Sequence, residues 1–181
     1  LAHEYFNKDW KPMAFSNAAE NLMEAKLTFA ASAHLLDHIE DLNIPDAARE
    51  MLHSIEDPIL RETTLDMFTN QQFRRDLFIK GPRQLSNSER QSRLQNLSFM
   101  MLVHPDDRPK TVQSSLGKAK LDDSIYSPIC EVLSEDGFSP KTFAYLQSHS
   151  LCKHLSPSAL LQAPTILCGS RTCSPAHDTV T

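Results

Sequence analysis

The pattern of apolar and polar positions predicts a short α/β piece followed by a mainly helical chain. A capping pattern at Asn17 and Glu20 opens the first predicted helix, and Leu27–Phe29 has the composition of a strand. A strand needs hydrogen-bond partners for its backbone, and the helical pattern that follows offers none. We therefore expect residues 1–33 to be the end of an α/β domain whose other strands lie upstream.

Helical spacing of apolar residues prevails from residue 34 to residue 121. Helix starts in this stretch are marked by Pro45, Pro58 and the capping box that begins at Ser86. Leu77–Ile79 either ends a helix or forms a short strand, and residues 97–121 alternate well enough for a small antiparallel sheet. We expect 34–121 to be a helical, bundle-like middle domain with that sheet.

Three short helices are predicted in residues 122–181, which we expect to form a helix-turn-helix or partial winged-helix-like module. The first runs over Asp123–Glu135 and ends at Gly137; the others begin at Ser139 and Ser156. Pro164 is expected to kink the last helix. The fold class predicted for the whole chain is therefore mainly α, within the α+β class.

Composition excludes several classes of function. The 181 residues carry a net charge of −5, which argues against a general nucleic-acid binder, and the last predicted helix has no Lys or Arg to read DNA. No apolar run is long enough to span a membrane. The four cysteines form no CxxC pair, which favours reduced thiols in a cytoplasmic protein over a zinc site.

The glycines are isolated, and none of the glycine-rich motifs that hold a nucleotide or cofactor phosphate occurs. A backbone that approaches a phosphate closely usually needs several glycines together. The sequence therefore predicts no cofactor site within this chain. The four glycines are Gly81, Gly117, Gly137 and Gly169.

Candidate substrate-contacting residues lie in the aromatic-rich opening segment. His3 and Glu4 begin like a zinc-protease HExxH motif, but Asn7 stands where the second His would be, which excludes that reading. The segment either contacts a substrate or packs at a domain junction. Its substrate-proximal candidates are His3, Glu4, Tyr5 and Asn7.

Two further patterns have competing interpretations. His34 and His38 share one helix face, which suits either a transition metal or, as we favour without a third ligand, a solvated polar face. Arg74 and Arg75 open a basic stretch with six Lys or Arg between residues 73 and 93, whereas Asp and Glu dominate before residue 67. These charges are expected to meet across an interface, with an anionic partner as the alternative.

Several stretches resemble the so-called methyltransferase regulatory domain of bacterial class I S-adenosylmethionine-dependent methyltransferases, some of them protein-lysine methyltransferases. The likeness covers residues 1–121 well and is most specific over 60–81. It is carried by Leu1–Asn7, Asp9–Trp10, Ala25–Phe29, Leu60–Thr63 and Asn70–Asp76. Pro164 and the cysteine-containing end depart from the pattern.

The resemblance implies that a Rossmann-like domain, with S-adenosylmethionine and the methyl-transfer pocket, precedes this region in the parent enzyme. The catalytic and cofactor motifs of that domain are absent from this chain. The expected function is then a non-catalytic regulatory or substrate-positioning part, with the upstream domain and a protein substrate as partners. The alternatives are a free-standing protein-interaction module and, from the two histidines, a metal-dependent enzyme.

Overall fold

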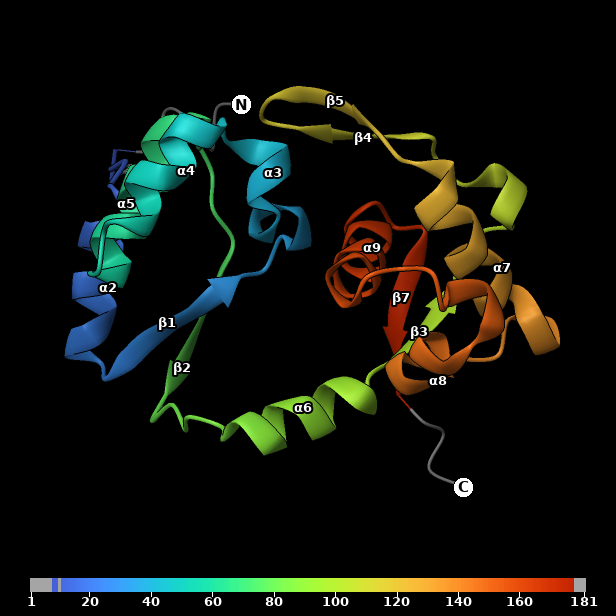
Figure 1. Ribbon diagram of the computed structural model, residues 1–181. Helices are drawn as coiled ribbons and strands as arrows, with labels where there is room; N and C mark the ends of the chain where they lie inside the picture. Colours follow the sequence, from blue (N-terminus) through green and yellow to red (C-terminus); the bar gives the residue numbers. More distant parts are fainter. Residues whose placement is uncertain (1–7, 10, 178–181) are drawn as a thin grey trace. The chain divides into compact units, whose positions relative to one another are not determined.

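The structure, a computed structural model, describes residues 8–9 and 11–177 and divides into two compact units (Figure 1). The first unit consists of Leu1–Ala31 and Pro45–Pro82, and the second of Ser32–Ile44 and Arg83–Thr181. Each unit thus combines two separate stretches of sequence. Within the described ranges, no helix has the length and apolar character needed to cross a membrane.

The first unit combines three helices with a two-stranded sheet. The helices are α2 (Phe15–Glu24), α4 (Asp46–His53) and α5 (Pro58–Thr69), and the strands are β1 (Leu27–Ser32) and β2 (Asp76–Lys80). Helix α2 packs against α5. The rings of Phe15, Phe29 and Phe78 meet with centroids 4.9 to 6.4 Å apart, so alternate residues of both strands face α2.

The strand predicted at Leu27–Phe29 is confirmed, but the premise that this chain offers it no partner is wrong. Strand β1 pairs with β2. Strand β2 contains Leu77–Ile79, for which the sequence allowed either the end of a helix or a short strand. The partner was missed because it lies almost fifty residues later along the chain, beyond the reach of a local pattern. That residues 1–33 close an upstream α/β domain stays a prediction.

The second unit contains the remaining elements. Those before its long helix are η1 (Leu35–His38), α3 (Glu40–Asn43), α6 (Asn87–Gln95), β3 (Ser98–Met101), η2 (Pro105–Asp107), β4 (Thr111–Ser114) and β5 (Gly117–Lys120). The others are α7 (Asp123–Phe138), β6 (Lys141–Thr142), α8 (Phe143–Ser148), η3 (Ser150–Cys152), α9 (Pro157–Gly169) and β7 (Cys173–Ala176).

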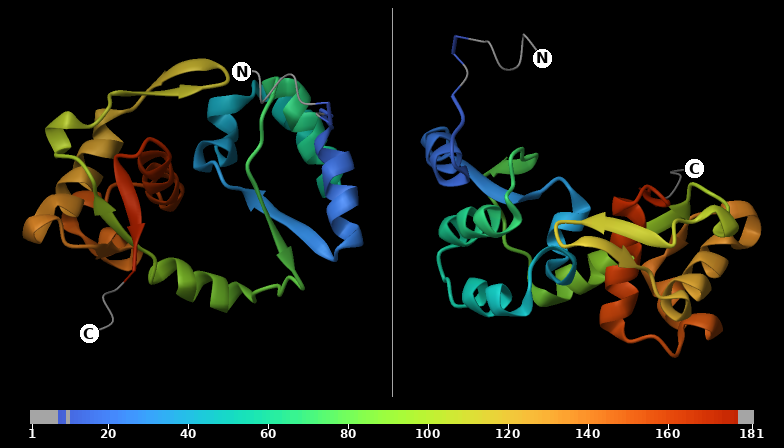
Figure 2. Two further views of the ribbon diagram at one scale, coloured as in Figure 1. Left: turned by 180° about the vertical axis from the view of Figure 1, so that it is seen from behind. Right: turned by 90° about the horizontal axis from the view of Figure 1, so that it is seen from above.

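A three-stranded antiparallel sheet with the order β6-β3-β7 lies among the helices of the second unit (Figure 2). Ser98 pairs with Thr142 on one side and with Ala176 on the other. Strands β4 and β5 form a separate hairpin in which Thr111 pairs with Lys120. The sheet predicted within residues 97–121 is therefore two structures, because β3 pairs with later strands rather than with the hairpin.

The core of the second unit is apolar and continuous. Helix α7 contributes Ile129, Val132 and Leu133, all fully buried, and α9 and β3 face them. Gly169 allows η1 to approach α9, because a Cβ at this position would lie 2.7 Å from the side chain of Leu36. Burial of apolar side chains in such a closely packed core stabilises a domain of this size.

Local signals explain most helix boundaries. Ser86 and Glu89 form the reciprocal capping box, and Asp57 and Ser156 accept from backbone N–H groups at the starts of α5 and α9. The helical geometry of α7 ends before Glu135, and Gly137 follows with a φ of 67°. These predicted boundaries are confirmed.

One expectation for the C-terminal part is corrected, and one strand there was not predicted. No helix starts at Ser139: Lys141–Thr142 forms β6, and Thr142 caps α8. Pro164 lies buried inside α9, and the kink expected there stays a prediction. The polar end of the chain contains β7, which is a strand because it pairs with β3 and which its composition does not predict. The α+β class with small antiparallel sheets is confirmed; the winged-helix-like part stays a prediction.

Candidate functional site: the Arg74 cluster

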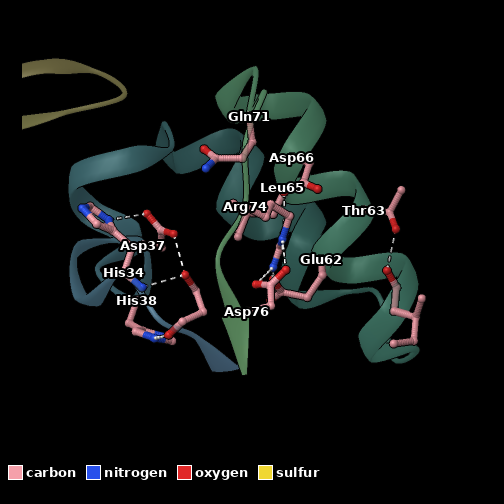
Figure 3. Close-up of polar contacts among 12 residues, drawn as sticks. His34, Asp37, His38, Glu62, Thr63, Leu65, Asp66, Gln71, Arg74 and Asp76 are labelled. Atoms are coloured by element: carbon pink, nitrogen blue, oxygen red, sulfur yellow. Dashed lines mark hydrogen bonds and ion pairs between the residues drawn. The ribbon is translucent and has the colours of Figure 1, made fainter. Parts of the chain in front are cut away.

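The most concentrated group of charges lies within the first unit, around Arg74. Helix α5 places Glu62 and Asp66 four residues apart, on one face of the helix. Asn70 ends α5 in the left-handed conformation with a φ of 50°, and the chain turns back into β2. This return brings Arg74 and Asp76 against the face that carries the two carboxylates (Figure 3).

The guanidinium of Arg74 donates to three carboxylates. Its Nη1 lies 2.5 Å from an oxygen of Asp66, and its Nη2 lies 2.8 Å from Glu62. Nε and Nη2 reach the two oxygens of Asp76 at 2.8 and 3.0 Å, the paired geometry that arginine favours with a carboxylate. The group also lies 4.2 Å from the ring centroid of Phe15. We call Arg74, Glu62, Asp66, Asp76 and Phe15 the Arg74 cluster.

Burial and the contacts of Arg74 act in opposite directions on the pKa values of this cluster. Burial raises the pKa of Asp66, although the charge and hydrogen bond of Arg74 act in the opposite direction. Burial alone would lower the pKa of Arg74, but its hydrogen bonds to Asp76, Glu62 and Asp66 raise it overall. Three carboxylates around one guanidinium leave the cluster with an excess of negative charge.

A cavity of about 400 Å³ adjoins the Arg74 cluster. Its apolar lining includes Met13, Ala18 and Met67, and its charged lining includes Asp66 and Asp76. Met67 is 76 % exposed at the rim. The cavity therefore combines an apolar wall with two carboxylates and one guanidinium, that of Arg74, and the excess of carboxylates suits an amphipathic cation.

The structure places the predicted site residues in different settings. Arg74 is engaged inside the first unit, whereas Arg75 is exposed. Arginine meeting carboxylates of the acidic helices is the arrangement expected from the charge pattern, although its partners here lie within the chain. An interface role for both arginines stays a prediction. The substrate-proximal candidates His3, Glu4, Tyr5 and Asn7 lie outside the described residues.

His34 and His38 do not converge on one point. His34 Nδ1 pairs with Asp37 at 2.9 Å, and Asp37 also accepts from the hydroxyl of Ser32 at 2.7 Å (Figure 3). His38 Nε2 lies 2.9 Å from the backbone oxygen of Ser32. Over residues 8–9 and 11–177, no three His, Cys, Asp or Glu side chains are grouped so that they could hold a metal ion.

The sequence reasoning missed Glu62, Asp66 and Asp76 as members of the site. The four-residue spacing of Glu62 and Asp66 was a usable signal, because it places both carboxylates on one helix face. Their arginine could not be chosen from sequence alone, since six basic residues follow within a short stretch. The turn after Asn70 brings Arg74, rather than another of these basic residues, against the carboxylates.

Comparison with known proteins identifies a family model, a curated relative and a solved structure of similar fold. Residues 1–80 match the family model of the predicted methyltransferase regulatory domain. Sll1526, an uncharacterized protein of Synechocystis sp. (strain PCC 6803), is 40% identical over 176 residues, which cover 97% of this chain and 34% of that protein. The structure of PKMT2 from Rickettsia typhi matches with a TM-score of 0.60 and 17% identity, over 96% of this chain and 38% of that one.

The three matches differ in what they establish. The family match confirms, for residues 1–80, the resemblance stated from the sequence. The likeness to PKMT2 shows a shared fold across nearly the whole chain. The chain spans only about a third of the length of the curated relative, so the activity of a whole protein is not carried over with the match.

Proposed function

We propose, from the match of residues 1–80 to the family model of the predicted methyltransferase regulatory domain, that this chain is the regulatory and substrate-positioning part of a methyltransferase. Its partners in this role are a methyltransferase domain, which lies upstream in the parent enzyme, and a protein substrate. The four free cysteines are consistent with a cytoplasmic setting. The chain takes part by binding rather than by transferring the methyl group.

S-adenosylmethionine, the cofactor that such an enzyme uses, does not fit the residues present. A cofactor loop of this kind needs clustered glycines between a strand and a helix N-terminus. Gly81 follows β2, but Pro82 comes directly after it and α6 begins only at Asn87. We therefore assign the cofactor to the methyltransferase domain.

The structural observation that supports the positioning role is the cavity beside the Arg74 cluster. The alkyl part of a basic side chain fits against Met67 and Phe15, and its charged end is attracted by the excess carboxylates. Arg74 holds the three carboxylates in place through its donors, so the cavity is largely formed before a ligand arrives. A basic stretch of a protein substrate is the ligand that this lining favours.

Peptide binding tests the positioning role. A fluorescent peptide with one lysine among neutral residues is titrated with the 181-residue chain, beside the same peptide with norleucine in place of lysine. The lysine peptide is expected to bind at least about tenfold more tightly, equal to about 1.4 kcal/mol. Met67→Ala should weaken its binding, whereas Leu116→Ala, an exposed apolar residue of the second unit, serves as the matched control. Equal affinity for both peptides contradicts the proposal.

A deletion in the Synechocystis relative tests the link to methyl transfer. Removing the third of that protein that matches this chain should preserve binding of S-adenosylmethionine and abolish methylation of the protein substrate. Calorimetry should also detect no saturable binding of S-adenosylmethionine to the 181-residue chain. Tight binding of the cofactor to this chain would reverse the assignment of roles.

One observation bears on the alternative, a free-standing interaction module. One face of the β1–β2 sheet is exposed, with Leu77 and Ile79 54 % and 44 % exposed beside Thr28 and Ala30. We assign this face to the methyltransferase domain, because about two thirds of the curated relative lies outside the matched region. Leu77→Ser should lower affinity for a separately produced methyltransferase part, whereas capture of an unrelated protein favours the alternative.

A further inference from the structure

The second unit contains a buried arginine that its own contacts do not satisfy. The side chain of Arg108, between η2 and β4, is only 3 % exposed. Its Nη2 donates to the hydroxyl of Ser127 at 2.8 Å and pairs with Asp123. Its Nη1 is buried and has no hydrogen-bond partner among the described residues. A buried guanidinium N–H without an acceptor is unfavourable, and native structures rarely leave one unmatched.

Arg108 lines a cavity of about 330 Å³ formed with one face of α7. Ser127, Cys130 and Ser134, at helical spacing on α7, form one wall, and Lys110 lies at the opening. The Cys130 thiol adds no negative charge to this wall, since burial raises its pKa to about 11. The cavity has room for a small ion together with a few attached atoms.

Among the charged side chains that line the cavity, Arg108 alone is buried. Arg108 and Lys110 share a single carboxylate, Asp123, from which the Lys110 ammonium is 3.5 Å away. Asp106 and Glu131 also line the cavity, but both are exposed, and solvent screens exposed charges far more than buried ones. Arg108 is thus the buried charge of this site, and it is a cation with an unused donor.

We propose that this cavity binds an oxyanion, a carboxylate or phosphate group, with an oxygen that accepts from Nη1 of Arg108. Lys110 supplies a second positive charge at the opening, and the Ser127 hydroxyl orients Arg108 through its hydrogen bond to Nη2. The site lies wholly in the second unit and is separate from the Arg74 cluster. The proposal of an oxyanion site does not depend on whether the chain positions a methyltransferase substrate.

Titration of the isotope-labelled 181-residue chain by NMR tests this site. Inorganic phosphate and acetate are added in separate experiments, with sodium chloride at equal ionic strength as the reference. The expected result is a saturable shift of the Arg108 guanidinium signal and of amides in residues 105–110 and 127–134. Saturation by phosphate alone or by acetate alone identifies which group the cavity prefers, and either supports an oxyanion site.

Two variants separate a built site from general surface charge. Lys110→Gln should weaken oxyanion binding by about threefold to tenfold, because one exposed charge is removed. Lys118→Gln, an equally charged change on the exposed hairpin strand β5, should leave it unchanged. Arg108→Lys, with folding checked by circular dichroism, should abolish saturation. Equal effects of the two lysine variants, an equal response to chloride, or no saturable shift at Arg108 would overturn the proposal.

Discussion

The two units of this protein are stabilised by different kinds of contact. In the second unit, nineteen buried residues form one continuous apolar core. In the first unit, the large buried side chains include Phe15 and Leu52, and the polar contacts of Arg74 connect α2, α5 and β2 around them. The first unit also exposes more large apolar side chains, among them Met67, Phe73 and Leu77.

This difference teaches which unit is built for contact with something else. A small unit with a thin apolar core gains little stability from burial alone and relies on specific polar contacts or on a partner. An exposed apolar surface on such a unit is a common sign of an interaction site. The family match falls on residues 1–80, which include nearly all of the first unit. The second unit, by contrast, has the core of an independently stable domain.

Replacing Arg74 should give the largest effect and should be confined to the first unit. Arg74→Met keeps much of the side-chain volume but leaves three partly buried carboxylates without their common partner, at a cost of about 3 kcal/mol. Hydrogen exchange should show faster opening of α2, α5 and β2, with α7 and α9 unchanged. The stability of Arg74→Lys should lie between that of Arg74→Met and that of the wild type, because an ammonium cannot replace the planar set of donors of a guanidinium. Equal loss of protection in both units would mean that they unfold together.

The complementary change is a cavity in the second unit. Leu133 is fully buried in α7, so Leu133→Ala should destabilise this unit by about 2–4 kcal/mol. Chemical denaturation should measure the loss of stability, and hydrogen exchange should locate it in α7, α9 and β3. Leu116→Ala, on the exposed turn between β4 and β5, should change stability by less than about 0.5 kcal/mol. A larger loss at Leu116 than at Leu133 would contradict the assignment of the core.

Much of this fold follows from local sequence signals, and the remainder depends on distant pairing. The starts of α5, α6 and α9 were predictable, because a capping side chain satisfies backbone donors only a few residues away. Strand β7 was not, since Cys173–Ala176 contains a proline and lacks apolar alternation. It is a strand because β3 offers backbone partners more than seventy residues earlier.

The candidate sites show the same division. The charge pattern predicted that arginines meet the acidic helices, but the geometry of the turn at Asn70 selects Arg74 and leaves Arg75 exposed. The sequence did not indicate a role for Arg108, because a single arginine among prolines and aspartates is typical of a solvated loop. Its burial results from the packing of that loop on α7, which no local pattern encodes.

Helix caps provide a matched comparison of the two units at intermediate size. Asp57→Ala removes the acceptor for the backbone N–H of Leu60 in α5, and Ser156→Ala removes the acceptor for Ala159 in α9. Each change should cost about 1 kcal/mol of unfolding free energy. In hydrogen-exchange experiments, Asp57→Ala should lower protection throughout the first unit. Ser156→Ala should lower protection only near the start of α9, because the second unit has the larger core. Similar spreading in both units would argue against the difference proposed between them.

The smallest expected effect is a pH dependence confined to the Arg74 cluster. Because burial raises the pKa of Asp66 above its ordinary value of 3.8, the native state holds that proton more tightly than the unfolded chain. The contribution of Asp66 to stability is therefore fully present below pH 3.8 and is lost as pH rises through the native pKa. Asp66→Asn removes this titration while retaining an oxygen acceptor for Arg74. The unfolding free energy of the variant minus that of the wild type should thus increase between about pH 3 and about pH 7. Asp106→Asn, an exposed change in the second unit, corrects for general charge effects. A difference that decreases with pH would show that Arg74 outweighs burial at Asp66, and the cluster would then be a stabilising ion pair rather than a site with spare negative charge.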